Sequence, residues 1–129
     1  MRRPIRFDTN SQSIAVDHAF SATAIPVQGD PPMPVDGAIF GVAAMSENSP
    51  HAGERHPDGD EILYLISGRV RIVLLESDDD DIELSAGDGL LVPKGVWHRV
   101  DILEPSRIVY LTPGPNGEHR PLDPALEND

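Results

Sequence analysis

Hydrophobic and polar residues alternate along most of this chain, and proline and glycine interrupt the alternation every few residues. The alternating segments are short and rich in β-branched and aromatic residues, which favours strands. No stretch has the spacing of apolar side chains that an amphipathic helix needs. Many short strands at close spacing predict an all-β protein, built as a sandwich or barrel. The segments that fit a strand are 21–27, 37–45, 61–67, 69–76, 89–93, 97–103 and 107–113.

The chain length fits a single domain, since 129 residues can bury one core but are too few for two ordinary ones. Residues 1–20 carry few apolar side chains, and we expect them to form an N-terminal arm. Residues 21–113 hold the predicted strands and form the barrel domain. Residues 114–129 are rich in proline and polar side chains, which predicts a C-terminal tail over the surface.

The amino-acid composition limits the classes of binding partner that we expect. The chain has 22 Asp and Glu against 10 Lys and Arg, a formal net charge of −12. Phosphate backbones and anionic lipid would repel it, so neither nucleic acid nor a membrane is an expected partner. Cysteine is absent, which excludes disulfides, thiolate nucleophiles and thiolate metal ligands. The N-terminus lacks the apolar run of a signal peptide, and we expect a cytoplasmic protein.

Four consecutive aspartates, Asp78 to Asp81, lie between two apolar segments. A calcium site is one interpretation, but the interleaved glycine and distal glutamate of a calcium loop are missing. The pattern favours a solvated hairpin loop.

A second group of polar residues has a spacing that suggests chemistry. His56 and Glu61 flank the turn signal Asp58-Gly59, and His98 follows a Pro-x-Gly turn at the start of a predicted strand. Imidazole and carboxylate side chains on adjacent strands of a small barrel form a ligand set with open positions, which suits Fe, Mn, Ni or Zn. A buried carboxylate without a compensating cation or proton would cost several kcal/mol.

These residues lie in two motifs that resemble those of the cupins, a family of small jelly-roll barrels. The first is Glu54-x-His56-x4-Glu61-x6-Gly68, with Glu54 where the family pattern has its first histidine. The second is listed by its fixed positions: Gly87, Pro93, Gly95 and His98, with Ile102 in place of a final asparagine. The motifs occur in the family order with a similar separation, so the resemblance implies an antiparallel jelly-roll β-barrel.

The resemblance also implies that one divalent transition metal is bound by His56, Glu61 and His98, with Glu54 as a fourth ligand or a catalytic base. Strand alternation agrees, because the residues that would then point inward are apolar: Leu63, Leu65, Val96 and Val100. It places three large side chains on the opposite face: Tyr64, Trp97 and Arg99. The opposing interpretation is a cupin that has lost its metal and keeps the polar cluster for packing.

Cupins include dioxygenases, isomerases, lyases and non-catalytic binding proteins, so the resemblance leaves the reaction open. The leading hypothesis is a metal-dependent enzyme acting on a small oxygenated molecule. The alternative is a non-catalytic module that binds a small organic acid or sugar. Exposed apolar strand faces favour a homodimer, and the resemblance implies the same, since cupins commonly pair through their sheets. His51 is expected in a solvated loop, with a place at the pocket entrance as the alternative, and His18 and His119 are expected in the arm and tail.

Overall fold

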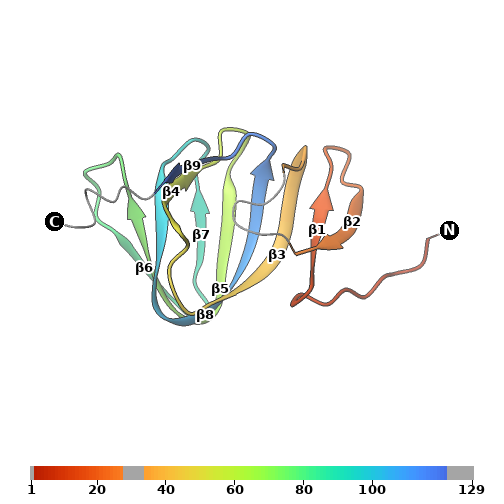
Figure 1. Ribbon diagram of the computed structural model, residues 1–129, viewed down its shortest axis with the longest axis horizontal. Coiled ribbons are helices and arrows are strands. Elements are labelled where there is room, and N and C mark those ends of the chain that lie inside the picture. Colours follow the sequence, from red (N-terminus) through yellow and green to blue (C-terminus); the bar gives the residue numbers. More distant parts are fainter. Residues whose placement is uncertain (1, 28–33, 122–129) are drawn as a thin grey trace.

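The computed structural model describes residues 2–27 and 34–121, and in these ranges the chain forms strands and no helix (Figure 1). Every strand pairing is antiparallel, as the all-β prediction requires. None of the described segments is a helix able to cross a membrane. The strands are β1 (Gln12–Val16), β2 (Ala22–Pro26), β3 (Gly37–Met45), β4 (His51–Arg55), β5 (Glu61–Leu74), β6 (Ile82–Ser85), β7 (Gly89–Val92), β8 (His98–Gly114) and β9 (Glu118–Pro121).

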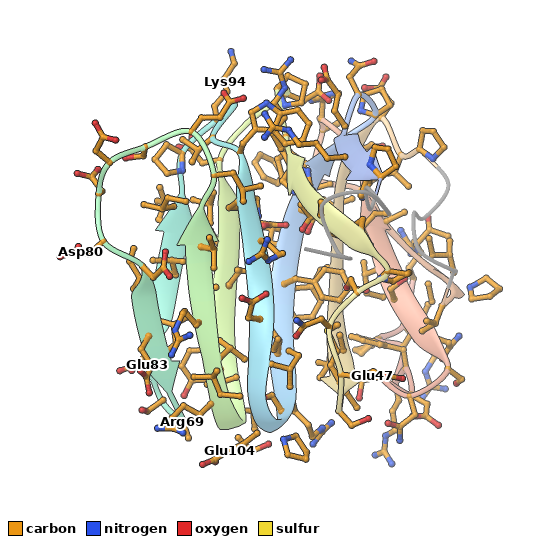
Figure 2. All side chains as sticks on the ribbon, turned by 60° about the vertical axis from the view of Figure 1, so that its left-hand side comes forward. Glu47, Arg69, Asp80, Glu83, Lys94 and Glu104 are labelled. Carbon is orange, nitrogen blue, oxygen red and sulfur yellow. The ribbon has the colours of Figure 1, made fainter. Side chains whose placement is uncertain are left out.

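Two long strands, β5 and β8, organise the barrel. They pair with each other over most of their length, from Ile62 opposite Leu111 to Leu74 opposite His98. β8 also pairs with β3 and, at one position, with β4. Near Glu104, at the bottom of Figure 2, β8 bends and passes from one layer to the other. The bent pair β5 and β8 therefore contributes strands to both of the sheet layers that face each other across the barrel.

Each long strand joins two segments that the sequence predicts as separate strands. Gly68 lies between two of these segments, and a glycine often marks the end of a strand. In the structure it has a φ of +88° and lies within a series of register shifts between Leu65 and Val70. These bulges let β5 bend without ending. They also change which alternate residues are buried, since Leu63 and Leu65 face the core before the bulges and Val70 and Ile72 face it afterwards.

The core lies between the layers and is made of aliphatic side chains. Glu61 is buried with Leu63 and Leu65, whereas Ile62 and Tyr64 are exposed, as strand alternation predicts. Val96 and Val100 pack against this core, as expected. The buried cluster consists of Leu63, Leu65, Val70, Ile72, Leu84, Val92 and Ile108.

Both terminal segments differ from the sequence expectation. β1 lies within residues 1–20, where we expected an arm, and pairs with β2 and β3. Its one fully buried side chain is polar, since Ser13 is only 3% exposed, whereas Ile14, Ala15 and Val16 are partly buried. β9 lies within the expected tail and pairs with β4; residues 122–129 of that tail lie outside the described ranges. The acidic run 78–81 forms the exposed loop between β5 and β6, as predicted.

Candidate metal centre

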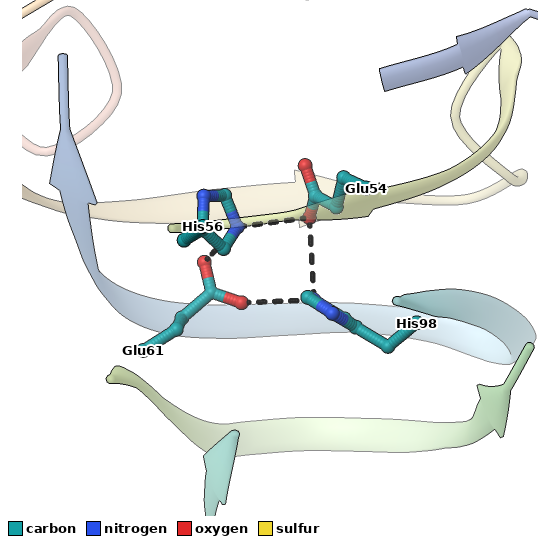
Figure 3. Close-up of side chains that lie close together, drawn as sticks. All are labelled: Glu54, His56, Glu61 and His98. Atoms are coloured by element: carbon teal, nitrogen blue, oxygen red, sulfur yellow. Dashed lines mark hydrogen bonds and ion pairs between the residues drawn. The ribbon is translucent and has the colours of Figure 1, made fainter. Parts of the chain in front are cut away.

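Four side chains that can bind a metal converge where β5 and β8 begin: Glu54, His56, Glu61 and His98 (Figure 3). Each offers one ligand atom, and the four atoms lie within 4.8 Å of one another. The Nε2 atoms of His56 and His98 lie 3.2 and 3.1 Å from the two carboxylate oxygens of Glu61. Oε1 of Glu54 lies 3.8 Å from Nε2 of His56 and 3.6 Å from that of His98. The residues that the motifs single out therefore face one small volume.

Two loops, one from each motif, hold the histidines in register. The carboxylate of Asp60 accepts a hydrogen bond of 2.7 Å from the backbone N–H of Lys94. The backbone N–H of Gly95 donates to the carbonyl of His56 at 3.1 Å. These bonds tie the turn after β4 directly to the turn before β8. The distance between the ligands of the two motifs is therefore fixed locally by backbone contacts.

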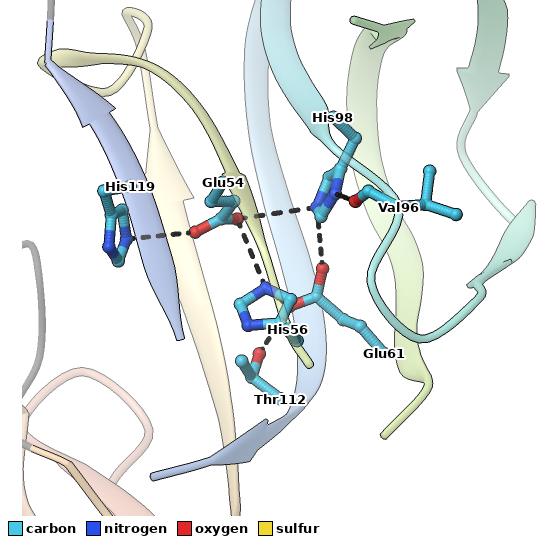
Figure 4. Close-up of polar contacts among 7 residues, drawn as sticks. All are labelled: Glu54, His56, Glu61, Val96, His98, Thr112 and His119. Atoms are coloured by element: carbon cyan, nitrogen blue, oxygen red, sulfur yellow. Dashed lines mark hydrogen bonds and ion pairs between the residues drawn. The ribbon is translucent and has the colours of Figure 1, made fainter. Parts of the chain in front are cut away.

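The orientation of His98 is set by its other ring nitrogen. Nδ1 lies 2.9 Å from the carbonyl oxygen of Val96, so Nδ1–H is the donor to that oxygen (Figure 4). In the neutral ring, Nε2 then carries the lone pair and points at the two carboxylates. This arrangement, with one imidazole nitrogen bonded to a backbone carbonyl and the other available, is usual for a metal-binding histidine.

His56 provides a direct test of whether a metal fits. Both of its ring nitrogens are buried and make no hydrogen bond within the described residues. Nε2 lies close to Glu61 without the alignment that a hydrogen bond needs. A buried polar atom left without a bond costs about 1–3 kcal/mol. A divalent cation facing this nitrogen would satisfy it, so the donor set fits a divalent transition metal.

Glu61 is the most constrained acid of the group. Its side chain is buried, and the hydroxyl of Thr112 donates to Oε2 at 2.6 Å (Figure 4). Burial raises the pKa of Glu61, but His56 and His98 outweigh that effect and the pKa falls below its usual range. The carboxylate is therefore ionised at neutral pH and needs positive charge beside it.

The same contacts act in the opposite direction on the imidazoles. Burial lowers their pKa values, but Glu54 and Glu61 more than offset it. The pKa of His56 rises to about 9 and that of His98 to about 10. In the metal-free protein both rings are therefore protonated at neutral pH and balance the two carboxylates. A metal ion must displace these protons in order to bind.

A comparison with models of protein families shows to which family this chain belongs. The sequence model described as the cupin domain matches residues 43–112, more than half of the chain. The chain belongs to the cupin family. The match contains both motifs and all four converging side chains. A search of curated proteins found no match to this cupin.

Solved structures agree with this assignment. A cupin-2 domain protein from Shewanella frigidimarina is 25% identical, with a TM-score of 0.52 over 62% of this chain and 74% of that one. A cupin superfamily protein from Desulfitobacterium hafniense is 19% identical, with a TM-score of 0.51 over 84% and 82%. Oxalate decarboxylase from Bacillus subtilis is 21% identical, with a TM-score of 0.53 over 64% of this chain but only 23% of that one. The last two identities support the fold alone.

Two further histidines lie beside the site of this cupin. Nε2 of His119 lies 3.3 Å from Oε2 of Glu54 (Figure 4), and the ring of His51 packs edge-on against His119, with centroids 5.0 Å apart. The expected positions of His51 in a loop and His119 in a surface tail were therefore wrong. Both lie in strands, because β9 pairs with β4 and brings residues far apart in the sequence together.

Side chains next to the ligands in sequence point elsewhere. Arg55 pairs with Glu118 through bonds of 3.0 and 3.1 Å, and its guanidinium lies 5.2 Å from the ring centroid of Trp97. Arg120 lies over the same ring at 4.2 Å. Trp97 therefore contacts two arginines and belongs to none of the ligating groups, in agreement with the opposite face on which strand alternation places it.

The raised pKa values predict how the metal-free protein responds to pH. His56 and His98 stabilise the fold fully below their ordinary pKa of 6.5, and this stabilisation is lost as the pH rises toward 9–10. Glu54 and Glu61 have lowered pKa values, so their contribution is present above 4.5 and is lost as the pH falls below it. We expect the contribution of this cluster to the free energy of unfolding to be greatest between these limits.

Urea denaturation in the presence of a chelator, at a series of pH values, measures this profile. The double variant His56→Gln/His98→Gln is the control, and its stability should change less between pH 6.5 and 10. Identical pH dependence of the two proteins across that range would contradict the assigned pairing.

Proposed function

We propose that this cupin is a metal-dependent enzyme acting on a small oxygenated molecule, as a dioxygenase or as an isomerase or lyase. The observation that carries the proposal is the convergence of two imidazoles and two carboxylates, of which His56, Glu61 and His98 are buried and Glu54 is partly exposed. Such a set, with its mixed nitrogen and oxygen donors, suits Fe, Mn, Ni or Zn.

The burial of the four side chains indicates which of them would bind the metal and which would face the substrate. His56, Glu61 and His98 have side chains that are 6%, 4% and 0% exposed, so they hold the ion from the interior. Glu54 is 23% exposed and lies on the accessible side. A metal bound there would polarise a bidentate oxygen substrate or activate O2. Glu54 is then the residue placed to exchange a proton with the substrate.

The electrostatics of Glu54 also support the second candidate, a non-catalytic module that binds a small organic acid or sugar. Burial raises the pKa of Glu54, but contacts with His119, His56 and His98 outweigh it and hold the pKa well below the usual range. A carboxylate with so low a pKa is a weak base. In this alternative the metal orients a ligand and no bond is made or broken.

The experiment that tests the proposal starts from metal loading. The purified protein, without an affinity tag, is dialysed against Fe, Mn, Ni or Zn, and the bound metal is measured by elemental analysis. We expect at least about one ion per chain for one of these metals. The loaded protein is then screened against oxalate, hydroxy acids, keto acids and sugars. A failure to take up any of the four metals at neutral pH would overturn the proposal.

The readouts separate the reaction classes. O2 consumption that depends on both Fe and a substrate identifies a dioxygenase, and product formation under anaerobic conditions identifies an isomerase or lyase. Thermal stabilisation by a ligand without turnover would favour the binding module; a ligand present at 100 times its Kd stabilises by about 2.7 kcal/mol. Metal-free protein is the matched control, since the proposal requires every one of these effects to depend on the metal.

We also propose that the functional unit is a homodimer formed through the outer face of β5 and β7. Ile62, Tyr64 and Leu91 are 48%, 45% and 57% exposed, and Ile62 lies opposite Leu91 in the sheet. An exposed apolar strand face of this kind can pair with its own copy across a two-fold axis. Light scattering should give twice the chain mass of 14.0 kDa, and Tyr64→Glu should give a monomer. A wild-type protein that is monomeric at micromolar concentration would contradict the interface.

A further inference from the structure

A second group of ligating side chains adjoins the candidate metal centre on its outer side. Besides the inner four residues, His51, Glu54 and His119 each offer one ligand atom, and these three atoms lie within 4.8 Å of one another. Glu54 belongs to both groups. The two histidines come from opposite ends of the motif region and meet only because β9 pairs with β4, with His119 directly opposite Glu54.

The carboxylate of Glu54 divides its two oxygens between the groups (Figure 4). Oε1 faces the inner imidazoles, at 3.6 Å from His98 and 3.8 Å from His56. Oε2 faces outward and lies 3.3 Å from Nε2 of His119. A carboxylate with one oxygen directed at each of two imidazole pairs has the geometry of a bridge between two cations. A histidine at this position could not serve both groups, since a neutral imidazole has only one nitrogen lone pair to offer.

We propose that His51, His119 and Oε2 of Glu54 form a second divalent-cation site, joined to the inner centre by the Glu54 carboxylate. Two imidazoles and one carboxylate make up a three-ligand set that zinc uses in proteins, with a further position left for water or substrate. The departure of this chain from the cupin motif at residue 54 then has a physical purpose, because it replaces a ligand for one ion with a ligand for two.

The burial of the residues agrees with an outer site that ions can reach. The side chains of Glu54 and His119 are each 23% exposed, whereas those of His98 and Glu61 are 0% and 4% exposed. Glu54 and His119 are therefore more accessible to an ion from solvent than His98 and Glu61. The pair of sites resembles the carboxylate-bridged two-metal centres in which both ions contact one substrate.

The inference extends the proposed metal centre, because both sites use Glu54, and paired variants separate the two. The full-length protein is dialysed against micromolar free Zn²⁺ at neutral pH, and bound zinc is counted by elemental analysis. We expect roughly two ions per chain in the wild type. We expect roughly one in His51→Ala/His119→Ala and one in His56→Ala/His98→Ala. Glu54→Gln should weaken both sites by about ten-fold or more.

His18→Ala is the matched control. His18 is another histidine beside an acid, Asp36, at 2.8 Å, but this pair lies on the exposed surface. This variant should keep both ions. His119→Gln gives a second test of the outer site with little loss of volume, and circular dichroism checks that every variant folds.

The outcomes distinguish failure of the second site from failure of the first. A wild type with one ion, kept in His51→Ala/His119→Ala and lost in His56→Ala/His98→Ala, would overturn the second site and leave the proposed function intact. One ion with the reverse pattern would support the outer site and overturn the inner centre. One ion lost in both double variants would indicate a single composite centre and would overturn the two-site proposal. Uptake of no zinc would overturn both sites.

Discussion

Replacing His98 with alanine will remove the ion from the inner metal centre. His98 is the most deeply buried of the four candidate ligands, with its side chain 0% exposed, and its Nδ1 is bonded to the carbonyl of Val96. Water or a neighbouring side chain cannot readily replace a nitrogen held in this way. Loss of a group that merely orients a ligand costs 10–100-fold in affinity, so we expect loss of the ligand itself to cost at least about a hundred-fold.

The measurement is competition against a chromophoric chelator in a chain that also carries His51→Ala and His119→Ala, so that only the inner centre is counted. His18→Ala in the same background is the control for loss of a histidine. His98→Gln tests the same ligand with less loss of core volume. Equal affinity in the His98 and His18 variants would contradict the assignment of His98 as a ligand.

Gly68→Ala will destabilise the fold by roughly 3 kcal/mol. Gly68 has a φ of +88°, and an added Cβ would collide with the carbonyl oxygen of Pro105 and with Ser106, whose Cα would be 2.7 Å away. Ser106 has little room to move, because it is 4% exposed and its hydroxyl donates to the carbonyl of Glu104 at 2.7 Å. The cost combines about 1–2 kcal/mol of backbone strain with about 1–3 kcal/mol of overpacking.

Gly87→Ala isolates the backbone part of this cost. Gly87 has a similar φ of +96°, but no described atom lies within 4 Å of an added Cβ. We expect its loss of stability to be only about 1–2 kcal/mol. Thermal unfolding of the metal-free proteins compares the two, and Gly68→Ala should lower the midpoint by roughly 10 °C. A fall no larger than that of Gly87→Ala would mean that the bend can open to admit a methyl group.

The sequence allowed the strands and the convergence of the inner four side chains to be predicted, because alternation is a local pattern and the two motifs resemble those of the cupins. Alternation along β5 predicts that Glu61, Leu63 and Leu65 share one face, and the resemblance to the cupin motifs implies which side chains lie near Glu61. The sequence left the direction of the Glu54 side chain open, since it depends on whether residues 54–56 are extended. The structure places Glu54 in β4, paired with His98 on β8.

The contact of His119 with Glu54 could not be predicted, because nothing in the local pattern shows that β9 exists. The segment 118–121 is short and polar, and it forms a strand only because the edge of β4 offers hydrogen-bonding partners to its backbone. His119 lies 65 positions from Glu54 in the sequence yet directly opposite it in the sheet. Spacing within a motif carries no information about such a contact. The merging of predicted strands at Gly68 was missed for a related reason, since a bulge depends on the partner strand.

The position of His98 in the sheet has a consequence for the dynamics of the centre. Its backbone is paired on both edges, with Leu74 of β5 on one side and Glu54 of β4 on the other. Strands that cover both edges of a residue limit local opening of its backbone. We therefore expect the amide of His98 to exchange more slowly than the amides of β9, an edge strand paired only with β4. An ion bound at the inner centre would accordingly have one ligand, His98, on a more rigid support than any ligand that β9 carries.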